Sequence, residues 1–241
     1  EALPPAGSLP CPDMSRTDIV LDGVGVRSRE AWAPSPTSGI VRPATVTALS
    51  GPSGAGKSTL VSCLLSDTVP GCGRILLRSA ASGGSARSDL PLSEVSPASW
   101  RSTISWVPQS PTLVPGTILD NMGGLPLANL EEAARATGFD AVLSTTPHGW
   151  DTTIGSGGVG LSVGQRQRLA LTRALAARSQ IVVLDEPTAH LDAVSEETVV
   201  RSIRAMRARG ATVIVIAHRS AIIEVADQII DVASANEAIV A

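Results

Sequence analysis

A glycine-rich octapeptide restricts the possible folds of this chain more than any other feature. Residues 51–58 read GPSGAGKS and satisfy the pattern G-x-x-x-x-G-K-[ST]. The run before them, 45–49, is β-branched and apolar, and 58–66 carries apolar side chains at helical spacing. A strand that turns through glycines into a helix aims backbone N–H groups and the positive end of the helix dipole at one point. The octapeptide therefore predicts a phosphate-binding loop.

Two acidic residues follow an apolar run much later in the chain. Residues 181–184 are Ile-Val-Val-Leu, the composition of a strand buried on both faces, but burial does not explain Asp185 and Glu186. Ligands bind at the carboxyl ends of strands in such sheets. We therefore expect Asp185 to hold Mg²⁺ with the Ser58 hydroxyl, Lys57 to reach the β- and γ-phosphates, and Glu186 to polarise an attacking water. The expected nucleotide contacts are Gly51, Ser53, Gly54, Ala55, Gly56, Lys57, Ser58 and Thr59.

Strands and helices are predicted to alternate along the chain. The expected strands are 17–22, 45–49, 73–78, 181–185 and 211–217, and the expected helices are 58–66, 130–136, 162–178 and 195–209. This alternation predicts an α/β fold with a parallel sheet covered by helices on both faces. Residues 79–99 are rich in Ser, Ala, Gly and Pro, so a loop is expected there.

The composition excludes several classes of function. The chain has 19 Lys and Arg against 22 Asp and Glu, and only 2% of its residues are aromatic. It therefore lacks the basic charge and the stacking platforms of a general nucleic-acid binder, and no nucleic-acid partner is expected. Its three cysteines form neither an even disulfide framework nor a spaced metal cluster, which favours a reducing compartment. The longest apolar runs are strand-sized, far short of the roughly 20 residues that cross a bilayer.

A pentapeptide, Leu161-Ser162-Val163-Gly164-Gln165, opens the predicted helix 162–178. Taken alone it is an ordinary Ser N-cap with a glycine turn. In its place between the phosphate-binding loop and the acidic strand end, it resembles the signature peptide of ATP-binding cassette (ABC) proteins. The resemblance covers nearly the whole chain after residue 16. It implies a P-loop NTPase core of the RecA-like type, with an antiparallel β portion and an α-helical signature subdomain inserted at about residues 100–170.

The same resemblance implies roles for further residues. Gln109 resembles the Q-loop glutamine that contacts Mg²⁺ and the attacking water, Asp192 the D-loop aspartate, and His218 the switch histidine at the γ-phosphate. ATP and Mg²⁺ are the implied cofactors. Members of the family pair head to tail, so that the signature peptide of one subunit acts on the ATP of its partner. The implied metal ligands are Ser58, Gln109 and Asp185, the catalytic residues are Glu186, His218 and Gln109, and the signature residues are Leu161, Ser162, Val163, Gly164 and Gln165.

A narrower resemblance concerns the branch of the family. Residues 115–121, PGTILDN, are similar to the exporter class, whose half-transporters carry a membrane domain ahead of the ATPase. The Pro-rich residues 1–16, which begin with Glu1, are then expected to be a linker from a missing transmembrane domain, and 17–241 the ATPase domain. On this interpretation the chain is a piece of a longer protein.

Within the exporters, three segments are similar to the bacterial heterodimers needed for cytochrome bd assembly. They are WVPQ at 106–109, PHGWDT at 147–152 and TAHLDA at 188–193. Together with Val163 they resemble the CydD-type subunit in particular. The resemblance implies a second half-transporter as partner and a place at the cytoplasmic face of the bacterial inner membrane. The implied substrates are haem or small thiols such as cysteine and glutathione.

Three positions depart from the family pattern. Ser28 occupies the slot of the aromatic that usually stacks on adenine, and Trp32 is the nearest ring, although packing on the linker explains Trp32 equally well. Val163 replaces the first glycine of the usual signature pair, and its β-branched side chain restricts close backbone approach. Ser156 stands where the exporter X-loop commonly has Glu. All three differences fit an asymmetric pair of ATP sites.

Two other functions stay open at this point. A degenerate regulatory subunit would bind ATP without efficient hydrolysis, but Glu186 and His218 argue against it. A soluble ABC protein that acts on ribosomes or DNA ends would need a second cassette or long coiled-coil arms, and this sequence shows neither.

Overall fold

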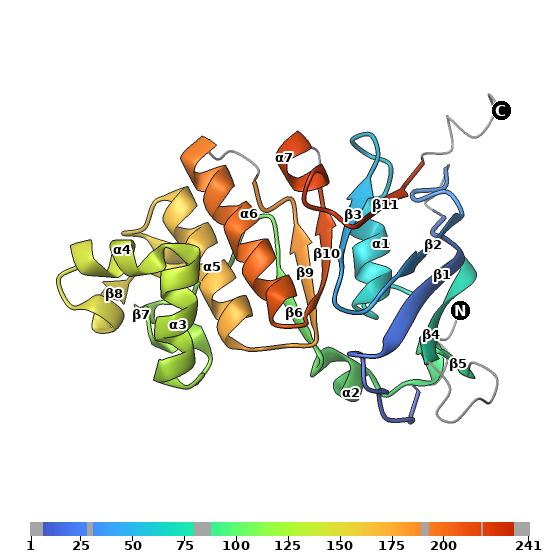
Figure 1. Ribbon diagram of the computed structural model, residues 1–241, viewed down its shortest axis with the longest axis horizontal. Helices are drawn as coiled ribbons and strands as arrows, with labels where there is room; N and C mark the ends of the chain where they lie inside the picture. The colour runs from blue at the N-terminus through green and yellow to red at the C-terminus, as the bar shows by residue number, and fades with distance from the viewer. Residues whose placement is uncertain (1–6, 28–30, 80–87, 189–192, 218, 234–241) are drawn as a thin grey trace.

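A computed structural model describes residues 7–27, 31–79, 88–188, 193–217 and 219–233. Its centre is a five-stranded parallel sheet in the order β11-β3-β10-β9-β6 (Figure 1). The strands are β3 (Val46–Ser50), β6 (Ile104–Val107), β9 (Ile181–Asp185), β10 (Thr212–Ile216) and β11 (Gln228–Asp231). Because all five run in the same direction, their carboxyl ends lie at one edge of the sheet, where ligands bind in this architecture.

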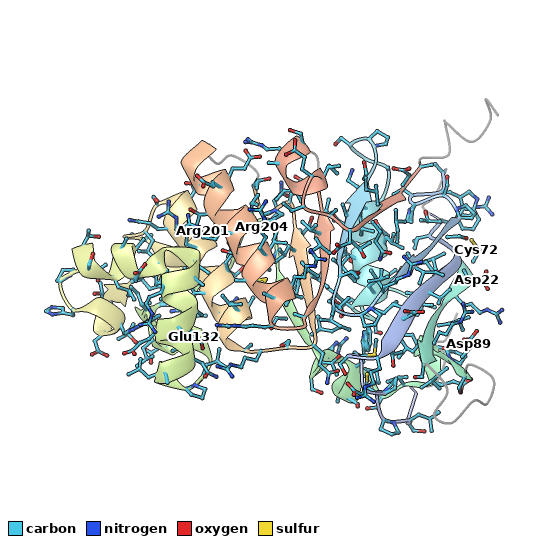
Figure 2. The ribbon with its side chains drawn as sticks, viewed as in Figure 1. Asp22, Cys72, Asp89, Glu132, Arg201 and Arg204 are labelled. Carbon is cyan, nitrogen blue, oxygen red and sulfur yellow. The ribbon has the colours of Figure 1, made fainter. Side chains whose placement is uncertain are left out.

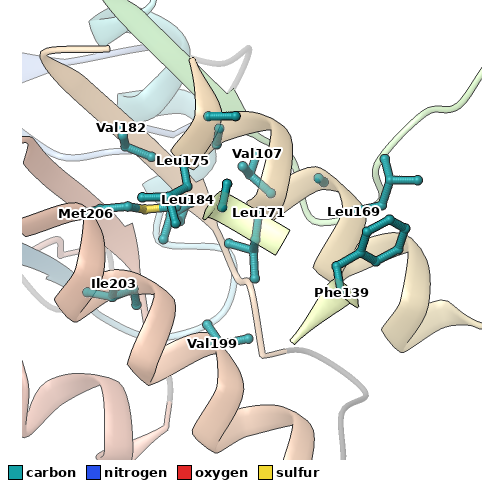
Figure 3. Close-up of a cluster of buried hydrophobic side chains, with 14 of the residues drawn as sticks. Val107, Phe139, Leu169, Leu171, Leu175, Val182, Leu184, Val199, Ile203 and Met206 are labelled. Carbon is teal, nitrogen blue, oxygen red and sulfur yellow. The ribbon is translucent and has the colours of Figure 1, made fainter. Parts of the chain in front are cut away.

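Side chains of the central strands alternate between two hydrophobic cores. In β9, Ile181 and Val183 join the core on one face. Val182 and Leu184 join the core on the other face, which Figure 3 shows. The first core also contains apolar residues of α1 (Lys57–Leu64), and the second contains those of α5 (Val163–Ala176) and α6 (Ala193–Ala208). Both faces of the strands are therefore buried, which confirms the predicted α/β fold.

An antiparallel sheet covers the α1 side, in the order β2-β1-β4-β5. Its strands are β1 (Thr17–Gly25), β2 (Thr37–Val41), β4 (Cys72–Ser79) and β5 (Ser88–Pro91). Leu21 and Leu77 of this sheet share a core with Leu60 of α1. The predicted antiparallel portion is therefore confirmed.

The helical portion lies at the other end of the molecule (Figure 1). It contains α3 (Leu127–Thr137), α4 (Phe139–Thr145) and a short antiparallel pair of β7 (Gly116–Thr117) and β8 (Thr153–Ile154). Three 3-10 segments also lie between β7 and α5: Asp120–Met122, Gly149–Asp151 and Ser156–Gly158. Elsewhere in the chain, a 3-10 segment spans Leu92–Glu94 and α7 spans Ser220–Ile223. Since β6 is a strand of the parallel sheet, we propose that the helical subdomain begins after Val107.

The expectation of a loop over residues 79–99 is wrong for the described part of that range. It contains β5, a 3-10 turn and the start of α2 (Pro97–Arg101). Arg78 and Asp89 form a bidentate ion pair across β4 and β5, with N–O distances of 2.7 and 2.8 Å. Trp100 is buried and donates from Nε1 to the Leu64 carbonyl at 2.7 Å. These tertiary contacts order a segment whose composition alone favours a loop.

Residues 7–16, the described part of the predicted linker, lie against the domain. Leu9 N–H donates to the Glu94 carbonyl at 3.0 Å, and Ser96 N–H donates to the Leu9 carbonyl at 2.7 Å. Met14 is 1% exposed. None of the described helices is long and apolar enough to cross a membrane.

Candidate active site

The glycine-rich loop connects β3 to α1 at the carboxyl edge of the parallel sheet. Gly56 adopts φ +93°, and a Cβ atom placed on it would lie 2.2 Å from the Pro34 backbone nitrogen. Only glycine fits this position, because both the backbone conformation and the contact exclude a side chain. Ser53 and Gly54 are exposed, Ala55 is buried, and no acidic side chain lies in the first turn of α1. The free N–H groups of this turn therefore face an open, anion-compatible site.

The side chain of Lys57 is buried within the phosphate loop. Its Nζ donates to the carbonyl oxygens of Gly51 and Pro52, each at 2.8 Å, and the residue is only 5% exposed. Burial lowers the pKa of the ammonium, and the negative charges of Glu186 and Asp185 partly counter this shift. The lysine is therefore within electrostatic reach of both acids predicted for the site.

The two acids stand where β9 ends. Asp185 Oδ1 lies 3.5 Å from Ser58 Oγ, so both oxygens can face one bound ion. Burial and the charge of Glu186 raise the pKa of Asp185, whereas Ser58 and Lys57 act in the opposite direction. Glu186 adopts φ +45°, a left-handed conformation that non-glycine residues rarely adopt and that concentrates at functional sites.

Gln109 reaches Glu186 from the neighbouring strand. It follows β6, which pairs in parallel with β9 so that Val107 lies opposite Leu184. Gln109 Nε2 donates to Glu186 Oε2 at 2.9 Å. The fold thus brings residues 51–58, 109 and 185–186 together at one edge of the sheet, as the sequence predicts.

The donor set fits a magnesium nucleotide. Mg²⁺ prefers hard oxygen ligands and is usually held by one or two carboxylates together with substrate phosphates. Ser58 and Asp185 supply such oxygens, and the loop N–H groups and Lys57 supply donors for phosphates. Across the described residues, no group of three or more His, Cys, Asp or Glu side chains could hold a metal ion by itself. Phosphate oxygens and waters would supply the remaining ligands of the ion.

The signature peptide lies at the start of α5. Ser162 is the N-cap: its Oγ accepts from Gln165 N at 3.2 Å, while Ser162 N–H donates to Gln165 Oε1 at 2.8 Å. Leu161 is buried, but Val163 is 55% exposed. Ser162 therefore caps α5, and Val163, the first residue of the helix, faces solvent.

Comparison with known proteins decides the family. The sequence profile described as ABC transporter matches residues 35–189, more than half of the chain. The chain belongs to the ABC transporter family. It is an ATPase domain of that family, so ATP is its nucleotide.

The relatives of this ABC domain are longer proteins. It is 37% identical over 228 residues to an ATP-dependent lipid A-core flippase of Cupriavidus pinatubonensis, covering 90% of the domain and 37% of the flippase. It is 37% identical over 195 residues to a fatty acid ABC transporter ATP-binding/permease protein of Mycobacterium bovis, covering 79% and 29%. A solved bacterial Atm1-family ABC exporter with ATP bound matches with a TM-score of 0.80 and 30% identity, covering 96% of the domain and 39% of that chain. The domain thus spans about a third of the curated relatives it matches.

The other predicted residues of the ABC site lie beside the phosphate loop or outside the described residues. The Trp32 ring lies against the backbone at Gly25 and Gly71, where added Cβ atoms would be 3.1 and 3.6 Å from ring carbons. The next two residues, Ala33 and Pro34, contact the loop at Gly56. Trp32 is therefore on a segment beside the loop, and its stacking on adenine stays a prediction. Ser28, Asp192 and His218 lie outside the described residues.

Sequence reasoning missed a buried amide that orders the chain after Gln109. Asn121 Oδ1 accepts from Val114 N–H at 2.9 Å, and Nδ2 donates to the carbonyls of Val114 and Thr117 at 3.1 and 3.0 Å. Arg173 of α5, whose pKa is lowered by burial, donates to the Asn121 carbonyl at 3.3 Å. The Asn in the PGTILDN segment was the available signal, but the sequence does not tell which groups it bonds.

Proposed function

We propose that this domain binds MgATP at the carboxyl edge of its parallel sheet and hydrolyses it to drive a membrane exporter. The observation that carries the proposal is the convergence of three separate chain segments: Ser58 lies beside Asp185, and Gln109 is bonded to Glu186. Lys57 and the loop N–H groups would bind phosphates. Ser58, Asp185 and Gln109 would hold Mg²⁺, which supplies neutralisation of phosphate charge when it is bound. His218 is proposed at the γ-phosphate.

The chemistry assigned to the residues follows from their present bonds. The Gln109 amide occupies Oε2 of Glu186 and fixes the orientation of the carboxylate. The carboxylate can then accept the proton of a water that attacks the terminal phosphorus, as a general base does. Lys57 Nζ donates to two carbonyls of the loop. Its ammonium has three N–H donors, and these can turn to phosphate oxygens. The binding loop is therefore organised before the ligand arrives.

We propose that a second half-transporter completes the unit. The peptide Leu161, Ser162, Val163, Gly164 and Gln165, of which Ser162 and Val163 are exposed, would act on the ATP of the partner in a head-to-tail pair, and Asp192 would lie at the contact. A fused transmembrane domain would place the ATPase at the cytoplasmic face of a bacterial inner membrane. The exporter relatives, of which this domain covers about a third, support a membrane partner.

Thermal unfolding tests the site directly with Asp185→Asn. The folded-state pKa of Asp185 is raised, so its ionised form costs stability, and this cost grows as the pH rises through the unfolded and folded pKa values. The neutral variant is expected to raise the nucleotide-free Tm by about 2 °C. Saturating MgATP is expected to raise the wild-type Tm by about 5–10 °C and to have little effect on the variant.

Asp67→Asn is the matched control for that experiment. Asp67 accepts from Arg101 at 2.9 Å on an exposed surface away from the loop, so this variant is expected to keep the full MgATP effect. A full MgATP shift in Asp185→Asn would contradict the proposed metal ligand.

A finer proposal concerns the substrate. We propose that the full-length protein is a CydD-type subunit of a cytochrome bd assembly exporter, on the basis of residues 106–109, 147–152 and 188–193 together with Val163. Inverted membrane vesicles that contain the full-length pair are expected to take up haem, cysteine or glutathione only with ATP. Uptake of a lipid or fatty acid, the substrates in the names of the relatives, without uptake of these three compounds would contradict it.

A further inference from the structure

A cavity of about 350 Å³ opens at the opposite end of β9 from the ATP site. Its residues come from α3, from the end of α5, from α6 and from the turns that enter β9 and β10. Val182, near the start of β9, lies in its wall, whereas Asp185 ends the same strand. The cavity therefore shares no residue with the proposed ATP site, and the inference below does not depend on that site. The residues that matter are Glu132, Leu175, Arg178, Val182, Met206 and Arg209.

The inner wall of the cavity is apolar. Leu175 of α5, Val182 of β9 and Met206 of α6 are between 1% and 3% exposed and belong to one hydrophobic core (Figure 3). A hydrocarbon group that reaches the inner wall would contact these apolar side chains, while the polar lining residues Arg178, Ser179 and Arg209 lie around it.

The mouth of the cavity carries more positive than negative charge. Glu132 of α3, labelled in Figure 2, shares its carboxylate between Arg178 Nη2 at 3.0 Å and Arg209 Nη2 at 2.5 Å. Arg209 Nη1 also donates to the Leu175 carbonyl at 3.3 Å. No other acid is among the lining residues, so two guanidinium groups face one carboxylate. The side chains of Arg178 and Glu132 are 57% and 48% exposed. Breaking an ion pair this exposed costs little free energy, so another carboxylate can replace Glu132 at Arg178.

We propose that this cavity binds a small monocarboxylate with a short hydrocarbon body. The guanidinium forks of Arg178 and Arg209 match a carboxylate, which would bind beside Glu132 or take its place. The hydrocarbon would lie on Leu175, Val182 and Met206. A free phosphate fits less well, because it has no group to place on the apolar wall and the net charge of the mouth is a single positive charge.

Methionine NMR can detect this binding without an assay of activity. The sequence has three methionines, and only Met206 lines the cavity; Met14 and Met122 are buried elsewhere. With ¹³C-methyl methionine in the 241-residue chain, hexanoate is expected to shift the Met206 signal and leave the other two unmoved. Hexan-1-ol and inorganic phosphate, which carry one half of the recognition each, are expected to shift it far less. The unmoved signals also report that the fold is intact.

Substitutions at the mouth should act in opposite directions. Arg178→Gln is expected to weaken hexanoate binding about fivefold, and Glu132→Gln to strengthen it by a similar factor, because each changes the charge that the carboxylate meets. Arg101→Gln is the matched control, since Arg101 forms a comparably exposed ion pair with Asp67 outside the cavity. The proposal is overturned if hexanoate leaves Met206 unmoved, if hexan-1-ol shifts it equally, or if Arg178→Gln binds as the wild type does.

Discussion

Glu186→Gln is expected to lower the rate of ATP hydrolysis about 10³-fold, while ATP binding stays close to that of the wild type. The amide has the same shape as the carboxylate and can still bond to Gln109, which lies 2.9 Å away, but it cannot accept a proton from the attacking water. Since Glu186 already adopts a rare left-handed backbone conformation, an isosteric change is the cleanest way to alter its chemistry alone. Phosphate release by the full-length transporter, with ATP binding measured in parallel, checks both parts.

Glu94→Gln is the control for this substitution, because Glu94 is an exposed carboxylate in the 3-10 turn Leu92–Glu94, outside the segments assigned to the site. It is expected to hydrolyse ATP at the wild-type rate. If Glu186→Gln also keeps the wild-type rate, the residue is not the base. If the wild type itself binds ATP and turns it over no faster than this variant, the alternative of a non-hydrolysing regulatory subunit is favoured.

The parts of the site that the sequence predicts are those whose signal is local. β9 was expected at 181–185 and spans Ile181–Asp185, because a run of buried apolar residues ends abruptly in acids. The helix after the phosphate loop and the helix after the signature peptide were also expected, since each has a start signal next to periodic apolar residues. In each case one short segment contains both the structural cause and the functional residue.

The parts that the sequence does not predict depend on segments that meet only in the fold. Nothing near Gly56 indicates that it contacts Pro34, because the contact joins the phosphate loop to the segment between β1 and β2, more than twenty residues away. The bond between Gln109 and Glu186 spans 77 positions and exists because β6 and β9 are neighbours in the sheet. Trp100 is likewise ordered by burial and by its bond to the end of α1, and β5 by pairing with β4, and these contacts outweigh a composition typical of loops.

Lys57→Ala is expected to weaken ATP binding about 100-fold, the loss that follows when charge-assisted hydrogen bonds to phosphate are removed. The chain contains one lysine, so no neighbouring ammonium can substitute for it. The loss should reflect charge more than shape, because the ammonium, now held at the Gly51 and Pro52 carbonyls, is the group that would meet the phosphates. Titration with a fluorescent ATP analogue measures the affinity.

Lys57→Met separates the loss of charge from the loss of packing. It fills most of the buried volume but carries no charge, so it is expected to bind ATP as weakly as Lys57→Ala does. Both variants leave the Gly51 and Pro52 carbonyls without their donor, so loop disorder is the competing explanation for weak binding. Because Lys57 is the sole lysine, ¹⁵N NMR of its Nζ in the wild type resolves this point. MgATP should raise the pKa of that amine, since phosphate charge favours the ammonium, and a pKa that does not move on binding would show that Lys57 does not contact the phosphates.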